Sequence, residues 1–307
     1  MSTITVLQQM GVITILVAIG IYLYKKSIVD NTTSRKLSAI VMDFCNPALI
    51  MASILSGDIT ATHSDLITAM ILGAIFYIGL VIMGFIFPFI VRAEKDSRRF
   101  YNVMTVYTNV GFIGIPVARA ILPANATLYV IICNVMYSLL FYTHGIIILS
   151  GGREKMNIKK IFSPGTIMAI LSLLVFWFKI KPPLIIANSI TYLGNATVFL
   201  SMTLLGVGIA RSGIASGLKN IRIWVYIAVR MVLLPIAMFF VLKIAGFSSV
   251  TILGLCLMAA MPIGNLPLIQ SEKMGEDTEL LANSIAISTA ASIITITALM
   301  SLFTSLI

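Results

Sequence analysis

Long apolar segments separated by short polar loops run through the whole of this 307-residue sequence. A helix of about 20 apolar residues crosses the hydrocarbon core of a bilayer, where every backbone polar group needs a hydrogen-bond partner within the protein. The segments therefore predict an all-α membrane protein with ten transmembrane helices. Their approximate ranges are 4–24, 37–55, 66–91, 100–121, 127–150, 163–179, 184–210, 222–243, 249–269 and 279–306.

Charged residues are few and unevenly placed. They make up 10% of the chain, against roughly 25% in a soluble domain. Of the 21 Lys and Arg residues, 16 fall in the five odd-numbered loops, whereas the even loops hold Lys179, Lys181 and Lys243. The positive-inside rule places the odd loops in the cytoplasm and both termini outside. The net charge of +10 thus indicates a multi-pass protein in contact with lipid, expected in a bacterial cytoplasmic membrane, and not nucleic-acid binding.

The sequence predicts neither a metal nor another cofactor. Cys45, Cys133 and Cys256 all lie inside apolar segments, and no pair of them has metal-ligand spacing. We expect them to be small buried hydrophobic residues. There is also no glycine-rich phosphate-binding loop followed by Lys and Ser or Thr, which argues against a nucleotide-driven pump.

Two of the apolar segments contain a motif that interrupts a helix. Residues 109–116 read Asn-Val-Gly-Phe-Ile-Gly-Ile-Pro, and residues 261–267 read Met-Pro-Ile-Gly-Asn-Leu-Pro. Proline removes a backbone donor, and glycine leaves helical geometry at low cost. In lipid, such breaks persist only inside protein or beside a water-filled cavity. Paired breaks in two halves of a chain indicate the binding site of a transporter.

Similar residues recur at a nearly constant spacing. They lie 147, 146 and 149 positions apart in the pairs Pro88 and Pro235, Pro116 and Pro262, and Asn46 and Asn195. We therefore divide the chain into residues 1–150, a polar cytoplasmic link at 151–162, and residues 163–307. Because five spans are an odd number, the second half enters the membrane from the opposite side, and the halves form an inverted repeat.

Four sequence patterns match a known family. They are Asn109 followed by Gly114-Ile115-Pro116, Pro262-x-Gly264-x2-Pro267, Ala228-Val229-Arg230 with Pro235, and Pro47 in the second span. With these patterns in order, the chain resembles the auxin efflux carriers, which include plant PIN carriers and bacterial permeases assigned to malate or malonate. The resemblance implies a scaffold bundle and a transport bundle in which broken helices 4 and 9 cross. The chain differs from many bacterial relatives in having no proline near Phe199.

Residues beside the breaks are the candidates for substrate binding. Asn109 and Asn265 each offer an amide donor and acceptor, either to a substrate or as caps of the freed backbone. Other residues of the two motifs are expected to shape the crossing: Gly111, Gly114, Pro116, Pro262, Gly264 and Pro267. Asn46 and Asn195 are expected as side walls of the same site, with Pro47 beside Asn46.

Three ionisable residues within the expected spans are candidates for a role in transport: Asp43, His144 and Arg230. Asp43 and Arg230 form either a structural ion pair, which lowers the cost of burying both charges, or part of the transport mechanism. In the second alternative, Arg230 is a partner of the substrate anion and Asp43 is a protonation site. His144 is either a proton-coupling residue, since histidine titrates near neutral pH, or a hydrogen-bonded packing residue.

Together these features predict a secondary transporter that moves a small organic anion by alternating access. The anion is expected to be a carboxylate such as malate or malonate, or an auxin-like acid. A sodium-coupled carrier of the bile-acid type is the alternative within transport, and a membrane receptor or scaffold is the alternative outside it. An enzyme is not expected, because His63 and His144 complete neither a metal site nor a catalytic triad. The sequence is compatible with a homodimer.

Overall fold

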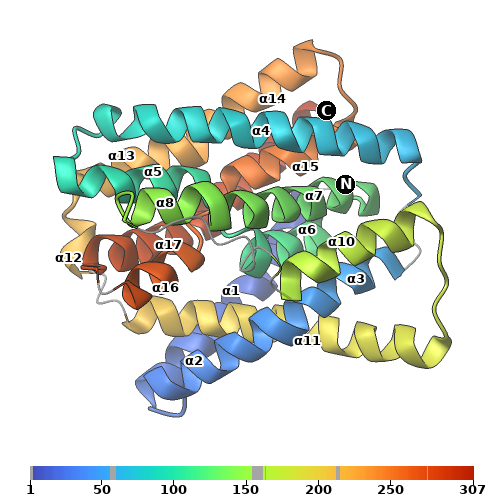
Figure 1. Cartoon of the computed structure of the whole chain (residues 1–307), viewed down its shortest axis with the longest axis horizontal. Coiled ribbons are helices and arrows are strands. Elements are labelled where there is room, and N and C mark those ends of the chain that lie inside the picture. Colours follow the sequence, from blue (N-terminus) through green and yellow to red (C-terminus); the bar gives the residue numbers. More distant parts are fainter. Residues whose placement is uncertain (1–2, 56–59, 154–161, 163, 212–214, 275) are drawn as a thin grey trace.

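The computed structural model describes the chain except for residues 1–2, 56–59, 154–161, 163, 212–214 and 275 (Figure 1). The described residues are mainly helical, and among them there is one isolated β-bridge and no strand. The all-α prediction is therefore confirmed. Of the expected link at 151–162, residues 154–161 lie outside the described part of the chain.

Within the described residues, six continuous helices are long and apolar enough to cross a membrane. Three are single α-helices: α4 (His63–Ile90), α11 (Leu184–Arg211) and α17 (Glu279–Leu306). The other three contain a π-helical turn between two α-helical parts. These are α2 (Asn31–Ile40) with α3 (Asn46–Leu55), α7 (Ala124–Leu140) with α8 (Ile146–Leu149), and α13 (Ile221–Tyr226) with α14 (Leu234–Ile244).

Shorter helices complete the fold. Apolar stretches of 10–17 residues lie in α1 (Thr3–Lys25), α10 (Pro164–Trp177) and α15 (Ser249–Ala260). The remaining α-helices are α5 (Arg98–Val106), α6 (Ile115–Ile121), α12 (Ala215–Leu218) and α16 (Leu266–Lys273). The segment expected at 100–121 is thus divided into α5 and α6, and the segment expected at 249–269 into α15 and α16. The helix is interrupted at both predicted motifs.

The three ionisable candidates share one local feature, which is a π-helical turn. The turns are Val41–Cys45 around Asp43, Phe141–Gly145 around His144, and Ile227–Leu233 around Arg230. Such turns inside α-helices are frequent at functional sites. The third turn is followed by Pro235, which has no N–H to donate to the preceding turn and so disturbs the regular hydrogen-bond pattern.

Glycines bring α1 and α11 into close contact. A Cβ atom added to Gly20 would lie 2.0 Å from the carbonyl oxygen of Thr203, and one added to Gly206 would lie 2.0 Å from that of Val17. Only glycine permits this approach of two backbones. The backbone of α3 comes close to the same helix at Gly194, where an added Cβ would meet it at 3.0 Å.

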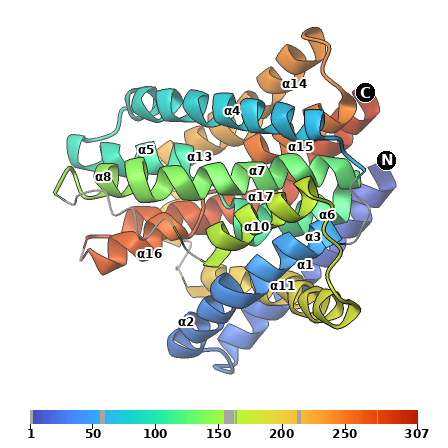
Figure 2. The ribbon, with the colours of Figure 1, turned by 45° about the vertical axis from the view of Figure 1, so that its right-hand side comes forward.

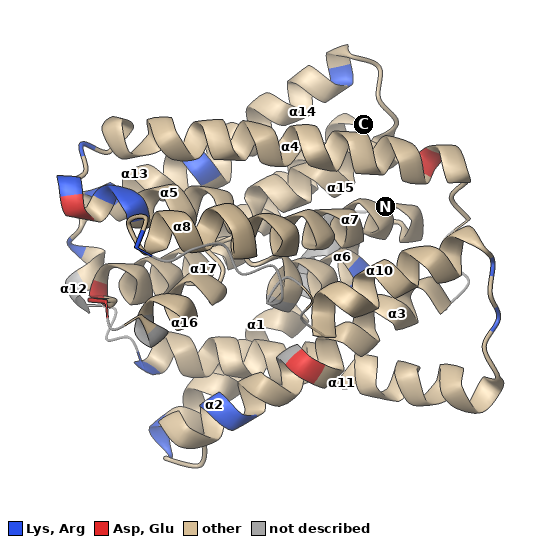
Figure 3. Cartoon of the chain, in the orientation of Figure 1, with Lys and Arg blue, Asp and Glu red and all other residues tan. Residues whose placement is uncertain are grey.

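The arrangement has two opposite sides and two opposite ends. Figures 1 and 2 show α11 and α2 on one side, α4 and α14 on the other, and α7 between them. Both termini lie at the same end of the molecule (Figures 1 and 2). Lys and Arg gather mainly at the opposite end, around the start of α5 and near α12 (Figure 3). The crossing of the broken helices lies inside this frame.

Candidate functional site

The two helix breaks meet as short extended segments. The backbone N–H of Asn109 donates to the carbonyl of Pro262 at 2.8 Å, and that of Gly264 donates to the carbonyl of Tyr107 at 2.9 Å. These two hydrogen bonds form an antiparallel bridge centred on Thr108. Backbone groups freed from one broken helix are therefore paired with those freed from the other, as burial in a membrane protein demands.

Local sequence explains why the second segment comes so close to the first. Pro262 has no N–H to continue α15. At Gly264, an added Cβ would lie 3.0 Å from the carbonyl oxygens of both Tyr107 and Thr108. A residue with a side chain would push the two backbones apart. The close approach of the two backbones at the crossing therefore requires glycine at position 264.

Each break ends at an asparagine. The carbonyl of Asn109 accepts from the N–H of Gly114 at 2.9 Å, and the carbonyl of Asn265 accepts from that of Ile269 at 3.1 Å. Both asparagines thus lie at the position from which the next helical segment starts. This is where asparagine is favoured as a helix cap, so the capping alternative has support from the backbone geometry. Substrate contact through the side chains is compatible with it.

A cavity of about 130 Å³ lies beside the crossing, lined by residues of both breaks. Six of the predicted site residues line it: Asp43, Asn46, Asn109, Gly111, Gly264 and Asn265. Polar residues that the sequence reasoning missed also line it: Thr108, Asn134, Tyr137, Ser138 and Tyr142. Asn134 and Ser138 lie one helical turn apart on α7 and so share one face of that helix. This spacing is the one feature of the sequence that could have pointed to them.

Polar atoms of the cavity wall are left without protein partners. The side-chain oxygens Oδ1 of Asn46 and Oγ1 of Thr108 are buried and have no hydrogen-bond partner among the described residues. A Cβ added to Gly111 would lie 2.9 Å from Nδ2 of Asn46 and 3.5 Å from Oδ1 of Asn134, so the two amides flank this glycine. Buried polar atoms are nearly always satisfied by protein, water or a ligand. The unpaired polar atoms of the cavity wall could therefore bind a polar ligand.

The remaining predicted residues lie elsewhere. Pro47, Gly114, Pro116, Pro262 and Pro267 do not line the cavity, and their contribution is to the path of the backbone. Asn195 is exposed on α11 and lies outside the cavity lining, so the structure does not place it as a side wall.

Arg230 and Asp43 do not form the ion pair that was one of the two alternatives. Arg230 is fully buried, and its guanidinium donates from Nε to the carbonyl of Thr105 at 2.9 Å and from Nη1 to the carbonyl of Ala259. Asp43 is exposed and lines the cavity, and no ion pair with Arg230 is found among the described residues. Helix-terminal carbonyls take the place of the carboxylate.

His144 is connected to the first break through Tyr107. Its Nδ1 lies 2.8 Å from the hydroxyl oxygen of Tyr107, which also donates to the carbonyl of Leu140 at 2.9 Å. The hydroxyl has one proton, so Nδ1 is the donor of the first contact. Nε2 of His144 is buried and has no partner within the described residues. Tyr107 was not among the predicted site residues.

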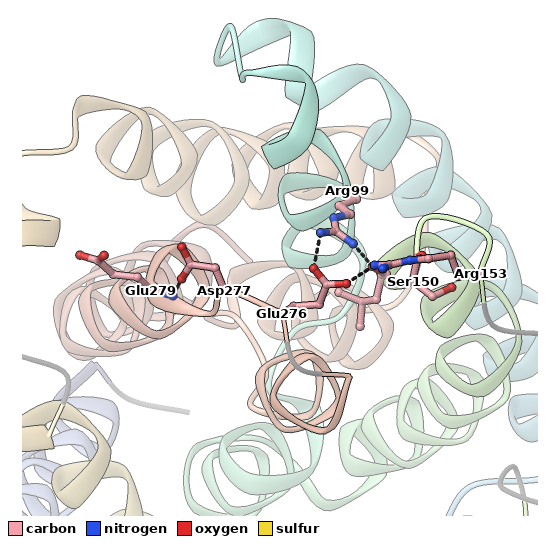
Figure 4. Close-up of polar contacts among 7 residues, drawn as sticks. Arg99, Ser150, Arg153, Glu276, Asp277 and Glu279 are labelled. Atoms are coloured by element: carbon pink, nitrogen blue, oxygen red, sulfur yellow. Dashed lines mark hydrogen bonds and ion pairs between the residues drawn. The ribbon is translucent and has the colours of Figure 1, made fainter.

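An ion-pair cluster links three helical regions at the cation-rich end of the molecule. Figure 4 shows the carboxylate of Glu276, between α16 and α17, pointing toward Arg99 of α5 and Arg153 after α8. Arg99 donates to Glu276 at 2.5 Å and to the carbonyl of Leu149 at 2.7 Å. The hydrogen bond from Arg99, with the nearby charge of Arg153, holds the pKa of Glu276 below its ordinary value.

Two comparisons with known proteins agree with this architecture. A family model described as membrane transport protein matches residues 5–160 and 152–300. The chain belongs to this family, the auxin efflux carriers. This auxin efflux carrier family member is also 24% identical over 298 residues to an uncharacterized transporter of Methanocaldococcus jannaschii, covering 93% of the chain and 94% of that relative. The resemblance found in the sequence motifs is therefore confirmed, and the protein is a membrane transporter by family.

The described parts of the chain contain no group of three or more His, Cys, Asp or Glu side chains placed to hold a metal ion. The three cysteines are buried and not joined in disulfides. Besides the carboxylate of Asp43, the polar groups at the cavity are amides, hydroxyls and backbone groups, which can form hydrogen bonds with a polar ligand.

Proposed function

We propose that this protein is a secondary transporter that moves a small organic anion through the cavity at the crossed helices. The observation that carries the proposal is that one cavity with several polar side chains takes its wall from both breaks, from residues 108–111 and from residues 264–266. Binding sites of transporters with discontinuous helices lie at such places. Family membership supports the transporter class, and the cavity is the proposed substrate site.

The proposed topology has ten spans in two inverted halves. In this proposal, the six long helices, the three shorter apolar helices and the divided segment α5–α6 are each assigned one crossing. The cation-rich end is assigned to the cytoplasm and the end with both termini to the outside, in accord with the positive-inside rule. Movement of one group of helices against the other around the crossing would give alternating access.

The proposed substrate is a compact carboxylate. The cavity has a volume of about 130 Å³. This is small for a ligand pocket, which typically measures about 300–1,000 Å³. The amide of Asn46 and the hydroxyl of Thr108 can donate to a carboxylate, and their free oxygen atoms can accept a hydrogen bond from a hydroxyl group such as that of malate. A short acid such as malonate or malate suits this wall better than an indole acid.

Uptake into proteoliposomes tests the proposal. Purified protein would be given radiolabelled malonate, malate and indole-3-acetate, with and without sodium and a pH gradient. We expect saturable uptake of a short acid, and its loss in Asn46→Ala with the protein still folded. Uptake that depends on sodium would favour the bile-acid-type alternative. Absence of uptake for every acid, in protein shown to be folded, would contradict the proposed substrate class.

A further inference from the structure

Arg230 joins the ends of the two helices that precede the breaks. Its acceptors, the carbonyls of Thr105 and Ala259, belong to the last turns of α5 and α15, which end at Val106 and Ala260. The side chain is fully buried in the protein. A single guanidinium thus holds both helix termini from the side of α13 and α14.

The charge of Arg230 is not balanced by a carboxylate. None of the ion pairs among the described residues involves it, and its Nη2 has no hydrogen-bond partner there. Tyr226 also binds the end of α5, because its hydroxyl donates to the carbonyl of Met104 at 2.8 Å. What faces the guanidinium is therefore the carbonyl ends of two helices.

Those helix ends carry negative partial charge. The last carbonyls of a helix act as about half a negative charge, so two converging ends amount to roughly one. Residues 108 and 264 of the cavity wall follow only three and five positions after the acceptors of Arg230. The helical segments that start at Val110 and Leu266 carry the opposite partial charge, and their attraction for an anion in the cavity would be cancelled by the carbonyl ends if no cation lay beside those ends. One guanidinium offsets them.

We propose that Arg230 determines the preference of the transporter for anions without touching the substrate. It is absent from the cavity wall, so its contribution is to the electrostatic potential there and not to a direct contact. In the low-dielectric interior, such a charge acts over several ångströms with little screening. This inference rests on the proposed function, because it concerns the charge of the substrate that the cavity accepts.

The test separates the charge of Arg230 from its hydrogen bonds. Arg230→Gln keeps amide donors but removes the charge, whereas Arg230→Lys keeps the charge. Tyr226→Phe is the matched control, since it removes a neutral hydrogen bond to the same end of α5. Binding of malonate and of its neutral diamide would be measured calorimetrically in detergent for all four proteins.

We expect Arg230→Gln to lower the malonate-to-diamide affinity ratio by about tenfold, while Arg230→Lys and Tyr226→Phe leave it nearly unchanged. An unchanged ratio in a folded Arg230→Gln protein would overturn the inference and leave the proposed function standing. If Arg230→Gln does not fold, Arg230→Lys decides, because loss of the malonate preference in that variant also overturns it. Failure of both variants to fold would assign Arg230 to folding alone. A wild-type protein with no preference for malonate would overturn the proposed function as well.

Discussion

The two helix breaks make one crossing with different residues. The first leaves α5 at Val106 and restarts through the π-helical turn Val110–Gly114, so that Pro116 already lies in the restarted helix. The second has Pro262 in the extended segment and Pro267 at the start of α16. Proline fixes the backbone and removes donors, whereas the first break keeps its N–H groups and places a buried threonine and asparagine at the cavity.

The glycines of the two breaks differ in the same way. At Gly264 an added Cβ meets backbone oxygens at 3.0 Å, and at Gly111 it meets the side-chain Nδ2 of Asn46 at 2.9 Å. Backbone cannot move without opening the crossing, but a side chain can turn away. We propose that the second break chiefly holds the geometry of the crossing and that the first break chiefly contacts the substrate. The following predictions test this division.

The largest effect is expected from Asn109→Ala compared with Asn265→Ala. Loss of a hydrogen bond to a charged group corresponds to roughly a ten- to hundredfold loss of affinity. We expect this loss for Asn109→Ala and a clearly smaller one for Asn265→Ala, as measured by malonate binding to folded protein. Equal losses would remove the distinction between the breaks, and no loss for Asn109→Ala would leave it as a cap only.

Gly264→Ala should lower the stability of the fold more than it lowers the affinity for malonate. The added methyl group presses on two backbone carbonyls, and overpacking of this kind costs about 1–3 kcal/mol. Thermal unfolding in detergent, followed by fluorescence, would report the loss. Gly79→Ala is the matched control, because nothing lies within 4 Å of a Cβ added there. Equal melting temperatures for the two variants would contradict the close approach at Gly264.

Gly111→Ala should have the opposite profile. The methyl group displaces the amide of Asn46, so we expect a melting temperature close to that of Gly79→Ala and a loss of malonate affinity of about tenfold. Because both changes act on one amide, the double variant Gly111→Ala/Asn46→Ala should bind about as weakly as Asn46→Ala. Additive losses would show that Gly111 acts by another route.

The smallest effect is expected at Glu276, far along the chain from the first break. Its lowered pKa means that its pairing with Arg99 and Arg153 stabilises the fold above the ordinary value of 4.5 and is lost as the pH falls through the folded-state pKa. The contribution is below about 1 kcal/mol, as for other partly exposed pairs. Glu276→Gln should therefore lower the melting temperature slightly at pH 7, and the difference from the wild type should shrink as the pH falls below 4.5. A larger loss at pH 3 would reverse this interpretation.

Sequence alone located the crossing because its signals are local. Proline and glycine act on the backbone within a turn of their own position, so both interruptions could be placed from their motifs. Asn46 and Asn195 were both expected beside the crossing; Asn46 lines the cavity, whereas Asn195 is exposed on α11. A spacing fixes depth in the membrane, whereas the face that a residue presents depends on packing, here on the contacts of α11 with α1 and α3.

The hydrogen-bond partners of Arg230 could not be predicted from the sequence, for a different reason. Arg230 is bound by backbone carbonyls, and every residue has a carbonyl, so no residue type marks the acceptor. A buried arginine suggested a carboxylate, and Asp43 was the nearest candidate by depth. Thr108 and Asn134 were missed because single polar residues in apolar helices usually serve packing, and only the cavity distinguishes them.

The π-helical turns at Asp43, His144 and Arg230 should be difficult to remove during evolution. Each turn holds one residue more than an α-helical turn, as a single inserted codon would produce. Removing that residue would restore a regular helix but rotate everything beyond it by about 100°. A deletion that restores a regular α-helix would therefore turn the inward-facing side chains beyond it toward the lipid. Such a deletion should be selected against, so the π-helical turn is retained.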